Sequence, residues 1–223
     1  ALGVLGLIAS TKKFVLPRYW KPFLSVIVLV DLIAMFVIPQ LSTPRVVVDE
    51  APAKYLQANM RYERYYTLGP VAPNYGSYYG IASVNQNDLP VPKTWSNYLK
   101  VHLDSNTDPI LFIGYYRVNQ KGPSAFAEFV RNQDGYSKLG VKYLVTTHNG
   151  LTSQEMGNAG LTKVFSNTGV DIYRLSNVGT YFELSRGCTE ISSRDRDQVK
   201  ISCDSEGTLL RKELWMSGWR AQL

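Results

Sequence analysis

The residues that could carry chemistry in this sequence are few and widely spaced. The chain holds two histidines, His102 and His148, and two cysteines, Cys188 and Cys203. Either histidine could act as a general acid or base beside a carboxylate, but a surface or packing role is the favoured interpretation for both. The cysteines lack the CxxC spacing of a metal site. We therefore predict no catalytic residue, no metal site and no cofactor in this chain.

Acidic residues and glycines also lack the spacing of a catalytic motif. Asp104 and Asp108 follow His102 in the sequence, where such clusters commonly mark a helix end. An RDRD run at 194–197 is typical of a solvated turn. The patterns GxGxxG, GxxxxGK[ST] and GxSxG are absent. The sequence therefore contains no signal of a phosphate-binding loop or of a nucleophile elbow.

The two cysteines instead suit a disulfide. Cys188 and Cys203 flank a polar segment, TEISSRDRDQVKIS, that can form a hairpin or a loop. In an oxidising compartment, a bridge that closes about 15 residues stabilises a chain by roughly 3 kcal/mol. Two free, buried thiols are the alternative. We favour the disulfide, which agrees with an outer location for this part of the chain.

A tyrosine-rich stretch, together with the amides in and after it, suggests a binding surface. Aromatic faces and amide groups serve carbohydrate binding, because apolar stacking combines there with hydrogen bonds that fix orientation. The alternative, which we favour, is that these tyrosines pack beneath a long loop. The candidate carbohydrate-binding residues are Tyr75, Tyr78, Tyr79, Asn85 and Asn87.

The composition is that of a folded chain with an apolar beginning. The 223 residues are 45% hydrophobic and 19% charged, which argues against disorder. The formal net charge is +6, but the basic residues are scattered, and four of them flank an apolar segment. A membrane flank explains these four more simply than a phosphate-binding patch does, so we predict no nucleic-acid partner. They are Lys12, Lys13, Arg18 and Lys21.

The segment from 22 to 41, PFLSVIVLVDLIAMFVIPQL, predicts a transmembrane helix. Its length matches the about 20 residues that cross a hydrocarbon core of roughly 30 Å. Pro22 suits a first helical turn, and Tyr19 and Trp20 lie where an aromatic belt is expected. We expect Asp31 to face other helices through a hydrogen bond, with a functional role as the alternative. A fully buried helix of a soluble core is the other interpretation of the segment.

The basic residues set the predicted topology. Four Lys or Arg precede the apolar segment, whereas Arg45 after it is soon balanced by acidic residues. The positive-inside bias puts the N-terminal loop in the cytoplasm, and everything after about Ser42 on the outer side of a bacterial cytoplasmic membrane. We expect both ends to be truncations. The predicted parts are the tail of a preceding transmembrane helix (1–10), a basic cytoplasmic loop (11–21), the transmembrane helix (22–41), an extracytoplasmic α+β domain (45–178) and a truncated β-rich part (179–223).

Hydrophobic periodicity and turn residues predict an α+β fold in the outer part, with helices first and a β-rich C-terminal part. The stretch 70–80 is predicted as loop. Asp49 is expected to cap the first helix, and DSEG at 204–207 to form the turn between the last two strands. The predicted helices are 50–60, 92–103 and 123–132. The predicted strands are 64–69, 141–147, two strands of a hairpin across 161–175, then 180–185, 198–203 and 208–216.

Several motifs, taken in order, resemble one family. Together they cover most of the chain and are similar to segments of the YfhO-like bacterial membrane proteins, whose last spans before the outer domain also match the apolar helix with Asp31. The family usually reads Gly-Tyr-Asp-Pro where this chain has residues 86–90, and the cysteine pair departs from the family pattern. The motifs are YYGIASVNQNDLPVPKTWSNYL (78–99), LGVKYLVTT (139–147), VDIYRLSNVGTYFEL (170–184) and LWMSGWRAQL (214–223).

The resemblance implies a polytopic protein of the GT-C type, a glycosyltransferase that uses a lipid-linked sugar donor in cell-envelope glycosylation. In that superfamily the catalytic acidic residue lies in an early outer loop, so no catalytic residue is carried over to this chain. The chain is then expected to be an accessory domain, with membrane lipid and a lipid-linked sugar or glycan acceptor as partners. The alternative is a non-enzymatic, membrane-anchored binding or assembly module of the envelope.

Overall fold

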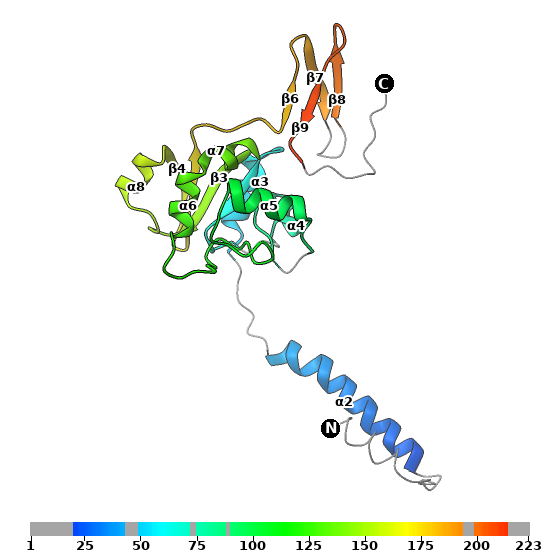
Figure 1. The fold of residues 1–223 in the computed structure, drawn as a ribbon. Coiled ribbons are helices and arrows are strands. Elements are labelled where there is room, and N and C mark those ends of the chain that lie inside the picture. The colour runs from blue at the N-terminus through cyan, green and yellow to red at the C-terminus, as the bar shows by residue number, and fades with distance from the viewer. Residues whose placement is uncertain (1–19, 43–48, 72–74, 88–89, 194–198, 214–223) are drawn as a thin grey trace. The chain divides into compact units, whose positions relative to one another are not determined.

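The computed structural model describes residues 20–42, 49–71, 75–87, 90–193 and 199–213 (Figure 1). The chain divides into two compact units, unit 1 (Ala1–Val48) and unit 2 (Asp49–Leu223). Unit 1 contains helix α2, and unit 2 contains the described strands and the other described helices. The predicted helix tail at 1–10, residues 11–19 of the predicted basic loop, the RDRD run and the motif at 214–223 lie outside the described residues. The last two residues of that loop, 20 and 21, belong to the first described helix.

Helix α2 (Trp20–Ser42) forms over the predicted apolar segment and extends slightly beyond it at both ends. Its large apolar side chains are exposed along the helix, with 54% of Phe23 and 75% of Phe36 accessible. Asp31 is exposed among them. Within the described part of the chain, no helix combines the length and the apolar character that crossing a membrane requires.

Unit 2 is built around a five-stranded sheet with the order β2-β1-β3-β5-β4. Strands β2, β1 and β3 run parallel, while β5 pairs antiparallel with both β3 and β4. The strands that follow β1 in the sequence, β2 and then β3, lie on opposite sides of it. The sheet therefore has a topological switch point at β1, and α/β sheets commonly bind ligands at such points. The strands are β1 (Arg64–Thr67), β2 (Ala82–Ser83), β3 (Val141–Thr147), β4 (Leu161–Ser166) and β5 (Val170–Leu175).

Both faces of the sheet are buried under helices (Figure 1). Successive strand residues point to opposite faces, so fully buried Tyr65 and Tyr66 belong to different core clusters, as do Ile172 and Tyr173. One cluster includes α3 (Ala51–Asn59) and α4 (Tyr75–Tyr79). The other includes α5 (Lys93–His102), α6 (Ala125–Arg131), α7 (Gln133–Lys138) and α8 (Ser153–Asn158).

Side-chain caps explain where several of these helices begin. The N-cap residue of α3 is Glu50, which makes no side-chain cap hydrogen bond, so the prediction of Asp49 as the cap is off by one residue. The Asp49 carboxylate does accept a hydrogen bond from the Ala51 amide at 3.0 Å. The Ser124 hydroxyl caps α6. Thr152 and Glu155 form a capping box at the start of α8, so two amide donors that a helix leaves unpaired are satisfied.

The C-terminal part of unit 2 contains two small antiparallel sheets, one pairing β6 with β9 and the other pairing β7 with β8. A strand does follow the predicted DSEG turn, but it pairs with β6 instead of with the strand before the turn. The β7–β8 hairpin therefore lies in sequence between two strands that pair with each other. These strands are β6 (Phe182–Leu184), β7 (Cys188–Ser193), β8 (Val199–Cys203) and β9 (Leu209–Arg211).

The fold is α+β with a β-rich C-terminal part, as the sequence predicts, but three short helices were not predicted. The assignment of 70–80 to a loop is wrong at α4, where Tyr75 and Tyr79 pack against the core. Helices α7 and α8 are each six residues long, too short for a helical period to stand out. The capping pattern Thr152–Glu155 was the available signal for α8.

Candidate functional site

The tyrosine-rich stretch forms helix α4, and this separates its rings into two environments. Tyr75 and Tyr79 are partly buried against the core, with ring centroids 5.7 Å apart. Tyr78 is 83% exposed. Packing therefore accounts for two of the three tyrosines, which lie on a helix and not beneath a long loop, and Tyr78 is the one that presents most of its surface to solvent.

Asn85 serves the fold of the sheet. It is 7% exposed, its Oδ1 accepts from the Thr67 amide at 2.8 Å, and its Nδ2 donates to the Thr67 carbonyl at 3.0 Å. The Ser83 hydroxyl donates to the same Oδ1 at 3.2 Å. The side chain thus continues the hydrogen bonding of β1 where β2 ends. Both polar atoms of the Asn85 side chain are therefore occupied by hydrogen bonds to Thr67 of β1. Asn87 is partly exposed in the irregular segment that follows Asn85.

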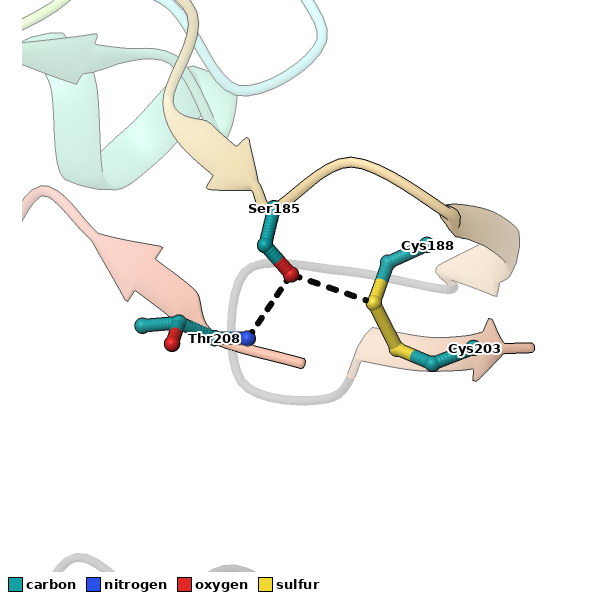
Figure 2. Close-up of a disulfide and its surroundings, with 4 residues drawn as sticks. All are labelled: Ser185, Cys188, Cys203 and Thr208. Carbon is teal, nitrogen blue, oxygen red and sulfur yellow. Dashed lines mark hydrogen bonds between the residues drawn. A yellow bond between two sulfur atoms is a disulfide. The ribbon is translucent and has the colours of Figure 1, made fainter. Parts of the chain in front are cut away.

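Cys188 and Cys203 form the predicted disulfide (Figure 2). They are opposite each other in the register of the β7–β8 hairpin, so the bridge closes the open end of this hairpin. The Ser185 hydroxyl lies 3.5 Å from Cys188 Sγ and accepts from the Thr208 amide at 2.9 Å. The bridge is therefore linked through Ser185 to the chain beside β9.

The two histidines differ in their surroundings. His102 is exposed on α5, where its ring lies 4.8 Å from the ring of Tyr98, so the surface role favoured from the sequence fits this residue. His148 follows β3, and its Nδ1 lies 3.2 Å from Oδ1 of Asp171. Asp104, which follows His102 closely in the sequence, forms an ion pair with Arg117 and is not hydrogen-bonded to either histidine.

Asp171 is fully buried and accepts hydrogen bonds from residues of β4, of β5 and of the turn after β3. Burial by itself raises the pKa of a carboxyl, but these hydrogen bonds outweigh it and hold the pKa of Asp171 well below its usual range. The carboxylate is therefore ionised at neutral pH. Besides His148, the donors are Lys163 Nζ at 2.8 Å, Ser166 Oγ at 2.6 Å, the Asn149 amide at 2.9 Å and the Tyr173 hydroxyl at 3.2 Å.

The register of the sheet brings this cluster together. Asp171 is paired with Thr146 on β3 and with Ser166 on β4. The His148 amide donates to the Gly169 carbonyl at 3.0 Å, which holds the end of β3 beside the β4–β5 turn. Asn149 adopts a left-handed φ of 54°, a sparsely populated conformation for a residue other than glycine, and its amide points at Asp171.

The cluster lies at the carboxyl ends of the parallel strands, the edge where α/β sheets place their ligands. β3 and β4 run in the same direction and end at Thr147 and Ser166. Asp49, the first residue of unit 2, belongs to this edge too, because the side-chain Nδ2 of Asn167 donates a hydrogen bond to its carboxylate. The chain therefore enters unit 2 at the edge that carries His148.

Asp171 orients the ring of His148. The contact with Asp171 favours the tautomer with its proton on Nδ1, and Nε2 makes no hydrogen bond to the described residues. The side chain is 39% exposed, so Nε2 can meet a ligand in solvent. Nowhere in the described residues do three His, Cys, Asp or Glu side chains gather into a metal site. The arrangement thus leaves Nε2 placed to form a hydrogen bond with a ligand.

Sequence reasoning did not single out Asp171. It lies in the strand VDIYRL, where its neighbours on both faces are buried. A charged residue within a strand of buried residues was the available signal, because a buried charge requires partners. The identity of those partners depends on the register of β3, β4 and β5, which the sequence does not state.

No family model matches the chain, and no curated protein or solved structure matches it. Function is accordingly inferred from the residues of the chain and their arrangement.

Proposed function

We propose that unit 2 is the extracytoplasmic accessory domain of a polytopic membrane glycosyltransferase, which uses a lipid-linked sugar donor in cell-envelope glycosylation. The observation that carries the proposal is the disulfide between Cys188 and Cys203. Disulfides form and persist in oxidising compartments and are rare in the cytosol. A hairpin closed by a disulfide suits a domain that works on the outer side of a bacterial cytoplasmic membrane.

The second support is helix α2. It exposes large apolar side chains such as Leu29, Ile33 and Phe36, each more than half accessible. A contiguous apolar surface of this kind calls for an apolar partner, which lipid and the neighbouring helices of a membrane bundle supply. The proposed crossing runs from 22 to 41, and the side chains after Ile38 lie outside the described residues.

The glycosyltransferase part of the proposal rests on the resemblance to the YfhO-like proteins. In this proposal the bond-making groups belong to the membrane part of the larger protein, and unit 2 positions a lipid-linked donor or a glycan acceptor. The edge at which the chain enters unit 2 carries His148, whose ring is already oriented by Asp171. That edge is the part of unit 2 that we assign to contact with the membrane-bound substrate.

Location is tested by topology measurements on the chain in bacterial membranes. Spheroplasts are treated with protease, and the thiols are labelled with a maleimide before and after reduction. The proposal expects digestion of unit 2 from outside, and labelling of Cys188 and Cys203 only after reduction. A variant with Cys188→Ser and Cys203→Ser controls for background labelling. Protection of unit 2 in intact spheroplasts, with reactive thiols, would overturn the proposal.

The enzymatic part is tested in the membrane protein that carries this chain. Residues 49–223 are deleted, membrane insertion is verified, and transfer of labelled sugar from a polyprenyl-phosphate donor to envelope glycan is measured. Loss of transfer with insertion retained supports an accessory role. Unchanged transfer would instead identify unit 2 as a non-enzymatic binding or assembly module.

A further inference from the structure

A cavity of about 390 Å³ opens in unit 2 where β1 and β3 begin, at the opposite edge of the sheet from His148. Its volume lies within the roughly 300–1,000 Å³ of small-molecule sites. Neither the disulfide nor the His148 cluster contributes to it. The walls come from residues 61–63 before β1, Lys142 on β3, the segment 178–182 that leads into β6, and Glu190 on β7.

The charges that line the cavity are balanced. Glu63 pairs with Lys142 at 2.9 Å, and Glu190 pairs with Arg61 at 3.2 Å. Two acids and two bases leave no net charge to select an anion or a cation. They do place hydrogen-bond acceptors and donors side by side, and all four side chains are partly exposed. Such a lining suits a ligand that both donates and accepts hydrogen bonds without carrying charge.

Glu63 is held as a carboxylate. Burial raises the pKa of its carboxyl, but hydrogen bonds from the Arg61 amide and from the Lys142 ammonium outweigh burial and lower the pKa below its ordinary value. The Arg61 amide donates to Oε2 at 2.7 Å, and Lys142 donates to Oε1 at 2.9 Å. The Tyr62 amide also donates to Oε2, at 3.2 Å, so two backbone amides and the Lys142 ammonium fix this carboxylate in the wall of the cavity.

The remaining wall is aromatic. Tyr62 stacks on Tyr181 with ring centroids 5.9 Å apart, and it meets Phe182 edge to face at 5.4 Å. The three rings are at most 9% exposed, so this wall is rigid and its shape is set before a ligand arrives. The Arg61 guanidinium lies 4.7 Å above the Tyr62 ring. A charge-balanced polar rim therefore stands next to an apolar, aromatic surface.

From this juxtaposition we infer that the cavity binds an uncharged carbohydrate, with hydroxyls hydrogen-bonded to Glu63, Glu190, Lys142 and Arg61 and apolar ring carbons against the Tyr62 cluster. Sugars combine dense hydroxyls with apolar faces, which is the combination that these walls present. Phosphorylated or sulfated ligands would need a surplus of positive charge, which the lining lacks. The inference rests on the proposed function only for the biological origin of the glycan.

The test uses the full chain in phospholipid nanodiscs, without sugar-headed detergents, on an array of neutral and acidic oligosaccharides. The strongest neutral binder is then titrated by calorimetry. Glu190→Ala and Arg61→Ala remove rim groups that stand outside the core clusters. Glu50→Ala is the matched control, because it breaks the exposed Glu50–Lys54 ion pair of 2.9 Å elsewhere on the surface. Thermal unfolding verifies that each variant is folded.

We expect a neutral oligosaccharide to bind, Glu190→Ala and Arg61→Ala each to weaken binding about tenfold or more, and Glu50→Ala to leave it unchanged. Inorganic phosphate should not compete. Binding that is unaffected by both rim variants would place the glycan elsewhere and overturn the assignment. So would binding of acidic glycans alone, or no binding at millimolar concentration. These outcomes do not depend on which side of a membrane unit 2 occupies, so they are separate from the topology test.

Discussion

Asp104 and Arg117 form a buried two-point ion pair, in which each Arg117 Nη atom donates to one carboxylate oxygen. The Arg117 side chain is 9% exposed and the Asp104 side chain 1%. The same carboxylate accepts from the Asn106 amide at 3.0 Å. This pair holds the irregular segment between α5 and α6, and Gly114 of that segment packs directly against the Thr67 carbonyl at the end of β1.

Arg117→Met should destabilise the chain by about 3–5 kcal/mol, because it leaves Asp104 buried without its counter-charge. Combining it with Asp104→Leu should recover much of the loss, since no unpaired charge then remains. Urea unfolding at pH 7 measures both. Lys138→Met, which breaks an exposed ion pair with Asp134, serves as the control and should change nothing measurable. If Arg117→Met alone unfolded at the same urea concentration as the wild type, the ion pair would not be what holds the segment.

Gly114→Ala should destabilise unit 2 by about 2 kcal/mol or more. Its φ of 84° is a conformation that favours glycine, and an added Cβ would overlap the Thr67 carbonyl oxygen. Gly157→Ala is the matched control, because Gly157 lies in α8 with open space around its Cβ position. That change should stabilise by about 0.4–1 kcal/mol. Thermal unfolding of both variants measures the change in stability. An equal change for Gly114→Ala and Gly157→Ala would contradict the close approach at Gly114.

Asp171→Asn should lower stability at pH 7 by about 2–3 kcal/mol, since hydrogen bonds to a charged group are lost. The folded-state pKa of Asp171 lies below its unfolded value. Its contribution is therefore present above the unfolded pKa of about 3.9 and is lost as pH falls below that value. Urea unfolding should show the gap between wild type and Asp171→Asn narrowing below pH 4. The exposed Asp134→Asn is the control, and a gap that stays constant with pH would refute the buried-carboxylate explanation.

Alkaline conditions should weaken unit 2 through its buried tyrosines. Burial raises the pKa of Tyr65 and of Tyr143 to about 12 each. The stability that each neutral ring contributes is complete below the unfolded pKa of about 10 and is lost as pH rises to the folded value, at up to about 1.4 kcal/mol per pH unit for each ring. Urea unfolding between pH 9 and 12 measures the slope. Tyr65→Phe should make it shallower, and an unchanged slope would exclude Tyr65 as a source.

Local patterns account for the elements that sequence reasoning predicted. The β-branched run at 141–147 forms β3, and the apolar run around Asp31 forms α2. Ser124 caps α6 as a polar residue at such a position does, whereas the N-cap of α3 is Glu50 and not the predicted Asp49. Short elements carry too few residues for a period, so α4 and α7 escaped prediction. The tyrosines of α4 were consequently assigned to a long loop.

By itself, the sequence determined the helix over the apolar segment, the main strands and the α+β class, because each depends on neighbours along the chain. It favoured a bridge between Cys188 and Cys203 over two free thiols, and the tertiary structure decided for the bridge. Only the tertiary structure decided that β1 lies between β2 and β3, that Asp171 meets His148, and that the Glu63 and Glu190 ion pairs line one cavity. These contacts join residues far apart in sequence. Strand order and register set them, and a periodic pattern specifies which face a residue takes but not which strand it will stand beside.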